Sequence, residues 1–192
     1  MTEKIKRKRK GNEGKKFEED IKKSFEEYNL YCLRLKDSSS SFSNNSQSRF
    51  TSTNPCDFIS YNIFNDQILY LECKSTEQIS IPLKNFKEHQ INEMFDVEQK
   101  FDYIKSFCII NFRKTENTYC LKIEDVYNYY YSLNNINIEK RKSITEKYCR
   151  EEGILIESMK KRTRFKYNLY NLFYKIKEKE AQENEGEVLD II

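Results

Sequence analysis

Two short apolar runs constrain the fold most, because each carries charged residues at one end that a buried strand would exclude. They lie within residues 54–76, NPCDFISYNIFNDQILYLECKST. Their β-branched and aromatic residues favour strands. The Asn-Asp pair at 65–66 tolerates positive φ, so we expect a two-residue hairpin turn there. Asp57 opens the first predicted strand, and Glu72 and Lys74 close the second.

The predicted turn sets the register of the hairpin. It places Phe58 opposite Cys73 and Asp57 opposite Lys74. Because side chains alternate with period two, Asp57, Glu72 and Lys74 then share one face of the sheet. As diagonal neighbours, Asp57 and Glu72 would stand about 7–8 Å apart, within reach of one bridging ion. A one-residue slip would send Asp57 to the other face.

Two converging carboxylates form a hard oxygen site that suits Mg²⁺. Lys74 would add a point charge that can stabilise a phosphodiester transition state. This pattern predicts metal-assisted hydrolysis of a nucleic-acid backbone. Glu-x-Lys also occurs at 13–15 and 98–100, so a surface ion pair at a sheet edge stays open on spacing alone. Glu18 could lean over the sheet end as a third carboxylate, or be an exposed helix charge.

Four apolar residues at helical spacing predict an amphipathic first helix over residues 15–29: Phe17, Ile21, Phe25 and Tyr28. A strand is expected at 30–36, and a polar, low-complexity loop at 37–55. Pro82 is expected to open a helix that runs to about residue 100.

Two more strands are expected at 103–112 and 118–123. A short helix at 124–133, a helix with an extended piece at 141–158 and a helix at 164–179 complete the prediction. This order predicts an α/β fold with a mixed sheet flanked by helices.

Composition excludes several classes of protein. The 192 residues fit one domain, and 38% hydrophobic with 34% charged residues is typical of a globular protein. No apolar run reaches the roughly 20 residues needed to cross a bilayer, and no secretory signal is apparent, so we expect a cytoplasmic protein without a membrane partner. The six scattered cysteines offer no zinc-ligand spacing and are expected to be reduced core residues. Four isolated glycines cannot form a phosphate-binding loop, which excludes a nucleotide cofactor.

Charge is uneven along the chain although the net charge is only +3. Eight Lys or Arg residues lie within residues 1–16, and acidic residues dominate the C-terminal end. We therefore expect a basic, flexible arm at 1–13, a nuclease domain at 14–177, and an acidic, disordered tail at 178–192. The arm suits a polyanion, or is simply a solvated tail.

The Asp57 and Glu72-x-Lys74 constellation resembles the core of PD-(D/E)xK nucleases. More closely, the chain is similar to the RecU family of Holliday-junction resolvases. GKKFEEDI at 14–21 resembles that family's first-helix motif, whose glutamate falls on Glu18. ECKSTEQISIPLKNFKEHQINEM at 72–94 matches its most recognisable block, and RKSI and TRFKY resemble its C-terminal signatures. The likeness covers most of the chain.

The resemblance implies a restriction-endonuclease-like fold and a homodimer that uses Mg²⁺ or Mn²⁺ to nick opposed strands of a four-way DNA junction. It implies Asp57 and Glu72 as metal ligands, Lys74 as a catalytic residue and Glu18 as a supporting one. The expected DNA-binding residues are Lys8, Arg9, Arg49, Lys84, His89 and Gln90.

Two departures from the family pattern keep alternatives open. The loop at 37–55 replaces the projecting stalk that family members carry, and Lys166 stands where the family usually has an acidic residue. Such a shortened form would suit a phage or mobile element. A restriction-type or repair nuclease acting on linear duplex, and a non-catalytic DNA-binding protein with a nuclease-like core, are the competing readings.

Overall fold

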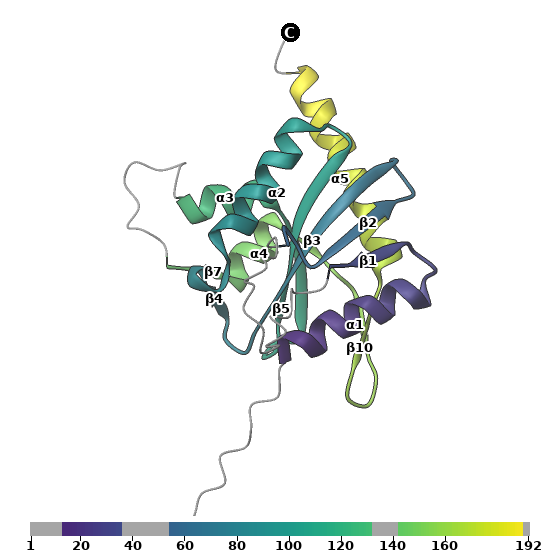
Figure 1. The fold of residues 1–192 in the computed structure, drawn as a ribbon, viewed down its shortest axis with the longest axis vertical. Helices are drawn as coiled ribbons and strands as arrows, with labels where there is room; N and C mark the ends of the chain where they lie inside the picture. The colour runs from purple at the N-terminus through teal and green to yellow at the C-terminus, as the bar shows by residue number, and fades with distance from the viewer. Residues whose placement is uncertain (1–12, 36–53, 132–141, 190–192) are drawn as a thin grey trace, which may run out of the picture.

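A central mixed β-sheet organises the protein (Figure 1). The computed structural model describes residues 13–35, 54–131 and 142–189. In these ranges the main sheet has the strand order β1-β2-β3-β5-β6-β8. Its strands are β1 (Cys32–Arg34), β2 (Phe58–Asn62), β3 (Gln67–Thr76), β5 (Ile104–Phe112), β6 (Asn117–Lys122) and β8 (Ile154–Leu155). β3 and β5 are parallel and the other neighbours are antiparallel, so the predicted mixed sheet is confirmed.

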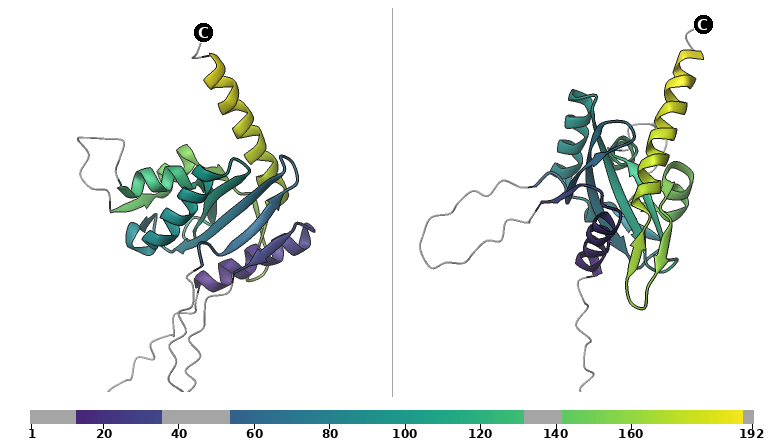
Figure 2. Two further views of the ribbon diagram at one scale, coloured as in Figure 1. Left: turned by 45° about the horizontal axis from the view of Figure 1, so that its top comes forward. Right: turned by 90° about the vertical axis from the view of Figure 1, so that its right-hand side faces the viewer.

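Helices cover both faces of this sheet. The helices α1 (Glu13–Glu27) and α5 (Leu169–Leu189) share one core with the strands, built on side chains such as Ile21, Phe58 and Phe173. On the other face lie α2 (Glu88–Lys100), α3 (Ile123–Tyr131) and α4 (Glu146–Glu152), whose core includes Met94 and Ile110. Figure 2 shows α2 and α5 on opposite sides of the sheet. The expected α/β class with flanking helices is therefore confirmed.

The β2–β3 hairpin has a longer turn than the sequence predicted. Asn62 pairs with Gln67 and Phe58 with Leu71, so four residues form the turn instead of two. Asp66 does adopt positive φ, at 55°. Phe64 leaves the ladder because its ring packs edge-on against Tyr170 and Tyr174 of α5, with centroids 4.9 and 5.6 Å away. The register shifts by two residues, which leaves each side chain on its predicted face.

The second long helix begins later than predicted. Pro82 does not open a helix: it ends β4 (Ser80–Pro82) and precedes the short 3₁₀ turn η1 (Leu83–Asn85). β4 pairs with β7 (Ser143–Thr145), where Ile81 lies across from Ile144. This pairing with a distant segment holds the chain extended until α2 starts at Glu88.

The C-terminal helix is also displaced from its prediction. Residues 165–167 form β10 (Phe165–Tyr167), which pairs with β9 (Ser158–Lys160) in a separate hairpin. α5 starts at Leu169 and continues to Leu189, through most of the segment that was expected to be an acidic, disordered tail.

The expected burial of most cysteines in the core is confirmed. All six cysteines are free, and five of them are buried in the core. Over the described ranges, no helix combines the length and the apolar character that crossing a membrane would require.

Candidate active site

Glu72 and Lys74 form a buried ion pair on β3. Glu72 is only 4% exposed, and the Lys74 ammonium contacts its Oε1. The second carboxylate oxygen, Oε2, accepts a hydrogen bond from the Gln90 side chain at 3.0 Å. The Lys74 ammonium also lies 5.9 Å from the centre of the Phe86 ring. The carboxylate is therefore held at both oxygens on the face of the sheet that α2 covers.

Hydrogen bonds to backbone groups of neighbouring residues hold Asp57 next to this ion pair. It precedes β2, and its N–H donates to the Leu71 carbonyl at 3.1 Å while its carbonyl accepts from Leu35 at 2.9 Å. Its Oδ2 accepts from the backbone N–H of Cys73 at 2.8 Å. The carboxylate thus takes the place of a strand carbonyl next to Glu72. The structure brings Asp57, Glu72 and Lys74 together, although by a different register from the one predicted.

Burial and the interactions between these charges shift the pKa values of Glu72 and Lys74. Burial, together with the nearby charge of Asp57, raises the pKa of Glu72 to about 7 against the opposing effect of Lys74. Burial alone would lower the pKa of Lys74, but the carboxylates of Glu72 and Asp57 outweigh it and raise that pKa above its usual value. Lys74 therefore stays protonated at neutral pH, while the environment of Glu72 in the metal-free protein favours its protonated form more than water does.

Glu18 approaches from the opposite side of the sheet, on α1. Its carboxylate forms an ion pair with the Arg34 guanidinium at the end of β1, and the Glu18 side chain is 20% exposed. Burial raises the pKa of the Cys73 thiol well above its usual value, and the charges of Asp57, Glu72 and Glu18 add to this effect. Glu18 is thus within electrostatic reach of the cluster, with Arg34 as its partner.

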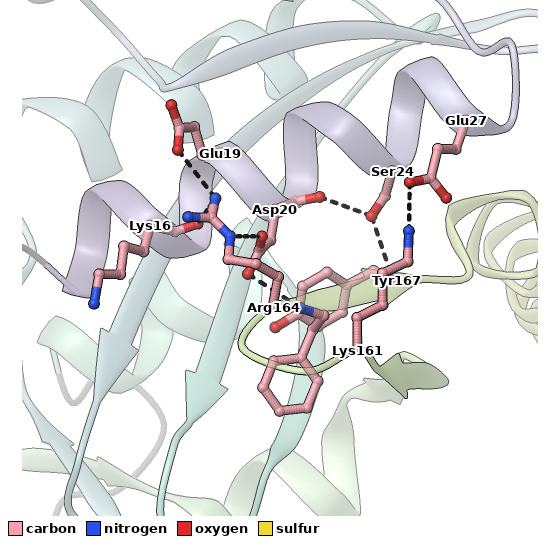
Figure 3. A network of polar contacts seen from close by, with 9 residues as sticks. Lys16, Glu19, Asp20, Ser24, Glu27, Lys161, Arg164 and Tyr167 are labelled. Atoms are coloured by element: carbon pink, nitrogen blue, oxygen red, sulfur yellow. Dashed lines mark hydrogen bonds and ion pairs between the residues drawn. The ribbon is translucent and has the colours of Figure 1, made fainter.

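The β9–β10 hairpin fixes the position of α1 (Figure 3). Asp20, a buried carboxylate of α1, accepts from Arg164 Nε at 2.5 Å and from the Phe165 N–H at 3.3 Å. Ser24 accepts from the Tyr167 N–H at 2.9 Å. These contacts hold the helix that carries Glu18 against the sheet. They come from the TRFKY segment, which the sequence had placed in a helix.

Lys166 finds its own partners on α1. Its ammonium lies 3.1 Å from Glu27 Oε2 and 4.3 Å from the centre of the Tyr28 ring. A basic residue in this position therefore pairs with an acidic residue of the first helix.

The predicted DNA-binding residues differ in exposure and do not form one surface. Lys84 is exposed on η1 beside the start of α2, His89 is partly buried in the first turn of α2, and Gln90 is 5% exposed and hydrogen-bonded to Glu72. The remaining three, Lys8, Arg9 and Arg49, lie outside the described residues.

Two basic residues near the cluster were missed from the sequence. Arg34 pairs with Glu18, and the charge of Lys87, the N-cap residue of α2, acts on the carboxylate of Glu72. A single arginine in an apolar strand was the available signal for Arg34. Lys87 stood in the recognisable 72–94 block, but spacing alone did not separate it from neighbouring lysines.

The carboxylates of Asp57 and Glu72 suit a hard cation that keeps several bound waters. Among the described residues no group of three or more His, Cys, Asp or Glu side chains converges as a ready metal site. Asp57 and Glu72 supply two carboxylates, and Mg²⁺ commonly binds proteins through one or two carboxylates while keeping several waters. Zn²⁺, which favours a closed set of four side chains in structural sites, fits this arrangement poorly.

Comparisons with known proteins identify related sequences. The family model described as Recombination protein U matches residues 12–169. The Holliday junction resolvase RecU of Lactococcus lactis subsp. cremoris strain SK11 is 34% identical over 97 residues, and that of Pediococcus pentosaceus is 37% identical over 84 residues. These matches cover 50% and 44% of this chain but only 42% and 39% of the relatives, so the aligned part spans about two fifths of their length.

Two further matches extend over more of the chain. The SPbeta prophage-derived uncharacterized protein YotM of Bacillus subtilis is 29% identical over 181 residues, covering 88% of this chain and 89% of that protein. Among solved structures, Archaeoglobus fulgidus Hjc, described as a Holliday junction resolvase, matches with a TM-score of 0.48 and 13% identity over 73% of this chain and 94% of its own.

Proposed function

The chain belongs to the RecU family, and on that premise we propose that it is a metal-dependent, structure-selective DNA endonuclease that resolves four-way junctions. The observation that carries the proposal is the convergence of Asp57, Glu72 and Lys74, which unites two carboxylates and a protonated lysine beside a strand end. The relatives named Holliday junction resolvase supply the expected substrate.

In this mechanism Asp57 and Glu72 would hold Mg²⁺ or Mn²⁺. Such an ion, when bound, stabilises the negative charge that develops on a phosphoryl group during hydrolysis. Asp57 is preorganised for this role because the Cys73 N–H fixes one of its oxygens. Glu72 must lose its proton to act as a ligand, and its pKa of about 7 in the metal-free protein allows this near neutral pH.

Lys74 contributes a fixed positive charge. Its pKa stays above the usual value in spite of burial, so the ammonium is charged whenever Glu72 can act. Placed beside the scissile phosphate, it would orient the attacking water and stabilise the extra charge of the transition state. Glu18 is the supporting carboxylate in this scheme, and its pairing with Arg34 holds it beside the end of β1.

DNA contacts outside the cluster are assigned to basic residues at its margin. Lys84 is exposed on η1, close to the start of α2 where Lys87 acts on Glu72. Side chains of this kind contact phosphates rather than base edges, so little sequence preference is expected from them. Lys8, Arg9, Arg49 and His89 complete the proposed set.

A homodimer belongs to the same proposal, because two such sites related by a two-fold axis match a two-fold junction. Support comes from apolar side chains in and beside the paired strands β1 and β2, which are 39–61% exposed: Tyr31, Leu33, Tyr61 and Ile63. Exposed apolar surface of this kind marks interaction sites. The match to a prophage-derived protein along most of both chains supports the assignment to a phage-type form, within a bacterial cytoplasm.

The substrate is tested by incubating the purified protein and Mg²⁺ with a mobile four-way junction and with a linear duplex of one arm's sequence. We expect paired nicks in the junction and little cutting of the duplex. Preferential cutting of the duplex would favour the restriction or repair nuclease. Tight, salt-sensitive binding without any cutting would favour the non-catalytic reading.

A further inference from the structure

The β9–β10 hairpin concentrates positive charge that the proposed mechanism does not use. Residues 158–167 contain no Asp or Glu and five basic residues: Lys160, Lys161, Arg162, Arg164 and Lys166. β9 is exposed along its whole length, and the turn at 161–163 is exposed as well. Figure 1 shows the hairpin projecting past α1 at the edge of the domain. The hairpin therefore presents its charge to solvent.

The base of the hairpin is anchored on α1. The Arg164 guanidinium pairs with Asp20, whose side chain is only 8% exposed, and the N–H of Tyr167 donates to Ser24 (Figure 3). α1 also carries Glu18, so the hairpin keeps a fixed position relative to the candidate active site. Its base lies within one helix diameter, about 10–12 Å, of Glu18, which is the length of about three base pairs of DNA.

The other end of the hairpin, which we call the ribbon tip, consists of Lys160, Lys161 and Arg162. Lys160 pairs with Glu116 and Lys161 with Glu27, and all four of these side chains are 38–57% exposed. Arg162 is exposed and forms no ion pair with another described residue. Exposed ion pairs contribute little to stability. The two lysines can therefore exchange their carboxylate partners for phosphates.

The shape and composition of the ribbon tip suit the backbone of a DNA duplex. The N–H of Lys161 donates to the Arg164 carbonyl at 2.7 Å, which closes a tight turn and keeps the hairpin narrow. The major groove of B-DNA, about 12 Å wide, admits a two-stranded ribbon of this kind. Proteins that bind single strands stack unpaired bases on aromatic side chains, and the three residues of the tip include none. A duplex is therefore the better partner.

We propose that the ribbon tip binds the phosphate backbone of a duplex arm of the junction, outside the candidate active site. This inference rests on the proposed function and adds a contact surface to it. The surface lies on the face of the sheet that α1 covers, opposite to Lys84 and Lys87. Contacts with phosphates carry no sequence information, so the ribbon tip strengthens binding to arms of any sequence.

The test measures the affinity of the full chain for a four-way junction in EDTA at several salt concentrations. The tip variant combines Lys160→Gln, Lys161→Gln and Arg162→Gln. Each lost phosphate contact reduces the slope of log affinity against log salt by about 0.9, so this variant should lose about 2–3 units of slope. The control removes the same number of charges from exposed positions on α2, α4 and α5, as Lys100→Gln, Lys147→Gln and Lys177→Gln. Its slope should equal that of wild type.

Two further variants separate charge from folding. The combination of Lys160→Arg, Lys161→Arg and Arg162→Lys keeps all three charges and should keep the wild-type slope, because phosphate binding depends on charge. The single change Arg162→Gln removes no ion pair between described residues and should lose about 0.9 units of slope. It decides the question if the triple glutamine variant does not unfold cooperatively on heating.

The outcomes distinguish the ribbon tip from the proposed function. An unchanged slope in the glutamine variants, or an equal loss in the α2, α4 and α5 control, would overturn the ribbon tip as a DNA contact and leave the candidate active site intact. A lost slope in the charge-retaining variant would also overturn it, since charge would then not be the cause. A wild-type protein that binds no junction in EDTA would overturn the proposed function and the inference together.

Discussion

Replacing Glu72 by glutamine should stabilise the metal-free protein at alkaline pH. The folded state raises the pKa of Glu72 from 4.5 to about 7. Between these values the folded protein binds more protons than the unfolded chain, so the contribution of Glu72 to the free energy of unfolding falls as pH rises. Above pH 7 the ionised Glu72 lowers the free energy of unfolding by its full amount. The difference between the two pKa values corresponds to about 3 kcal/mol. Gln mimics the protonated carboxyl at every pH.

The assay is urea unfolding in EDTA, followed by circular dichroism, of wild type and Glu72→Gln at pH 5 and pH 8. We expect the variant to be more stable by about 3 kcal/mol at pH 8 and by less than about 1 kcal/mol at pH 5. Glu93→Gln, at an exposed position on α2, is the control and should show no pH-dependent difference. Other buried acids, such as Glu98, titrate in both proteins and cancel from the comparison.

Mg²⁺ should then reverse the ranking, because a ligand that binds only the folded state adds to its stability. Wild type should gain stability in Mg²⁺ and Glu72→Gln should gain much less. A variant that is no more stable than wild type at pH 8 in EDTA would refute the reasoning, since it would mean that the buried carboxylate carries no penalty in the folded state.

Three further changes probe other parts of the structure. Asp20→Ala leaves the Arg164 charge without its buried partner and should lower the free energy of unfolding in urea by about 3 kcal/mol. Glu19→Ala removes the exposed partner of Arg164 and should lower it by less than about 1 kcal/mol. Equal losses would contradict the importance assigned to the buried contact. Phe64→Ala removes two edge-on ring contacts and should cost about 2 kcal/mol, and an unchanged stability would mean that these contacts do not hold the turn. Lys74→Met should reduce junction cleavage by about 10²–10³-fold with junction binding in EDTA within about threefold of wild type, so cleavage near the wild-type rate would remove Lys74 from the mechanism.

Local patterns predicted most of the secondary structure and the members of the candidate site. The helical spacing of Phe17, Ile21 and Phe25 placed α1 within two residues at each end, and all three are buried. The apolar runs around Asp57 and Glu72 became β2 and β3. Periodicity and turn residues carry this information within a short window of sequence.

The misplaced elements depend on contacts with distant segments. The turn at 63–66 is lengthened by the packing of Phe64 on α5, more than 100 residues later in the chain. The extended segment ending at Pro82 is held by β7, where Leu83 also donates to the Lys142 carbonyl. Neither partner can be read from the local pattern. The same holds for Arg34, whose role depends on α1 lying beside β1.

Asp57 lies near Glu72 as predicted, although the hairpin register used for that prediction differs from the one in the structure. Strand alternation placed it beside Glu72 in the predicted register, but in the structure it stands outside β2 and is fixed by the Cys73 N–H. The two-residue register shift preserved the face of Glu72 and Lys74. The cluster therefore formed even though the turn differed from its prediction.

The most direct test of the account compares cleavage of a four-way junction in Mg²⁺ by wild type, Asp57→Ala and Asp96→Ala. Asp96 is an exposed carboxylate of α2 and serves as the matched control. We predict that wild type and Asp96→Ala nick the junction at similar rates and that Asp57→Ala does not, although it still binds the junction in EDTA. Equal cleavage by Asp57→Ala and wild type would contradict the claim that the Asp57–Glu72–Lys74 cluster is the active site.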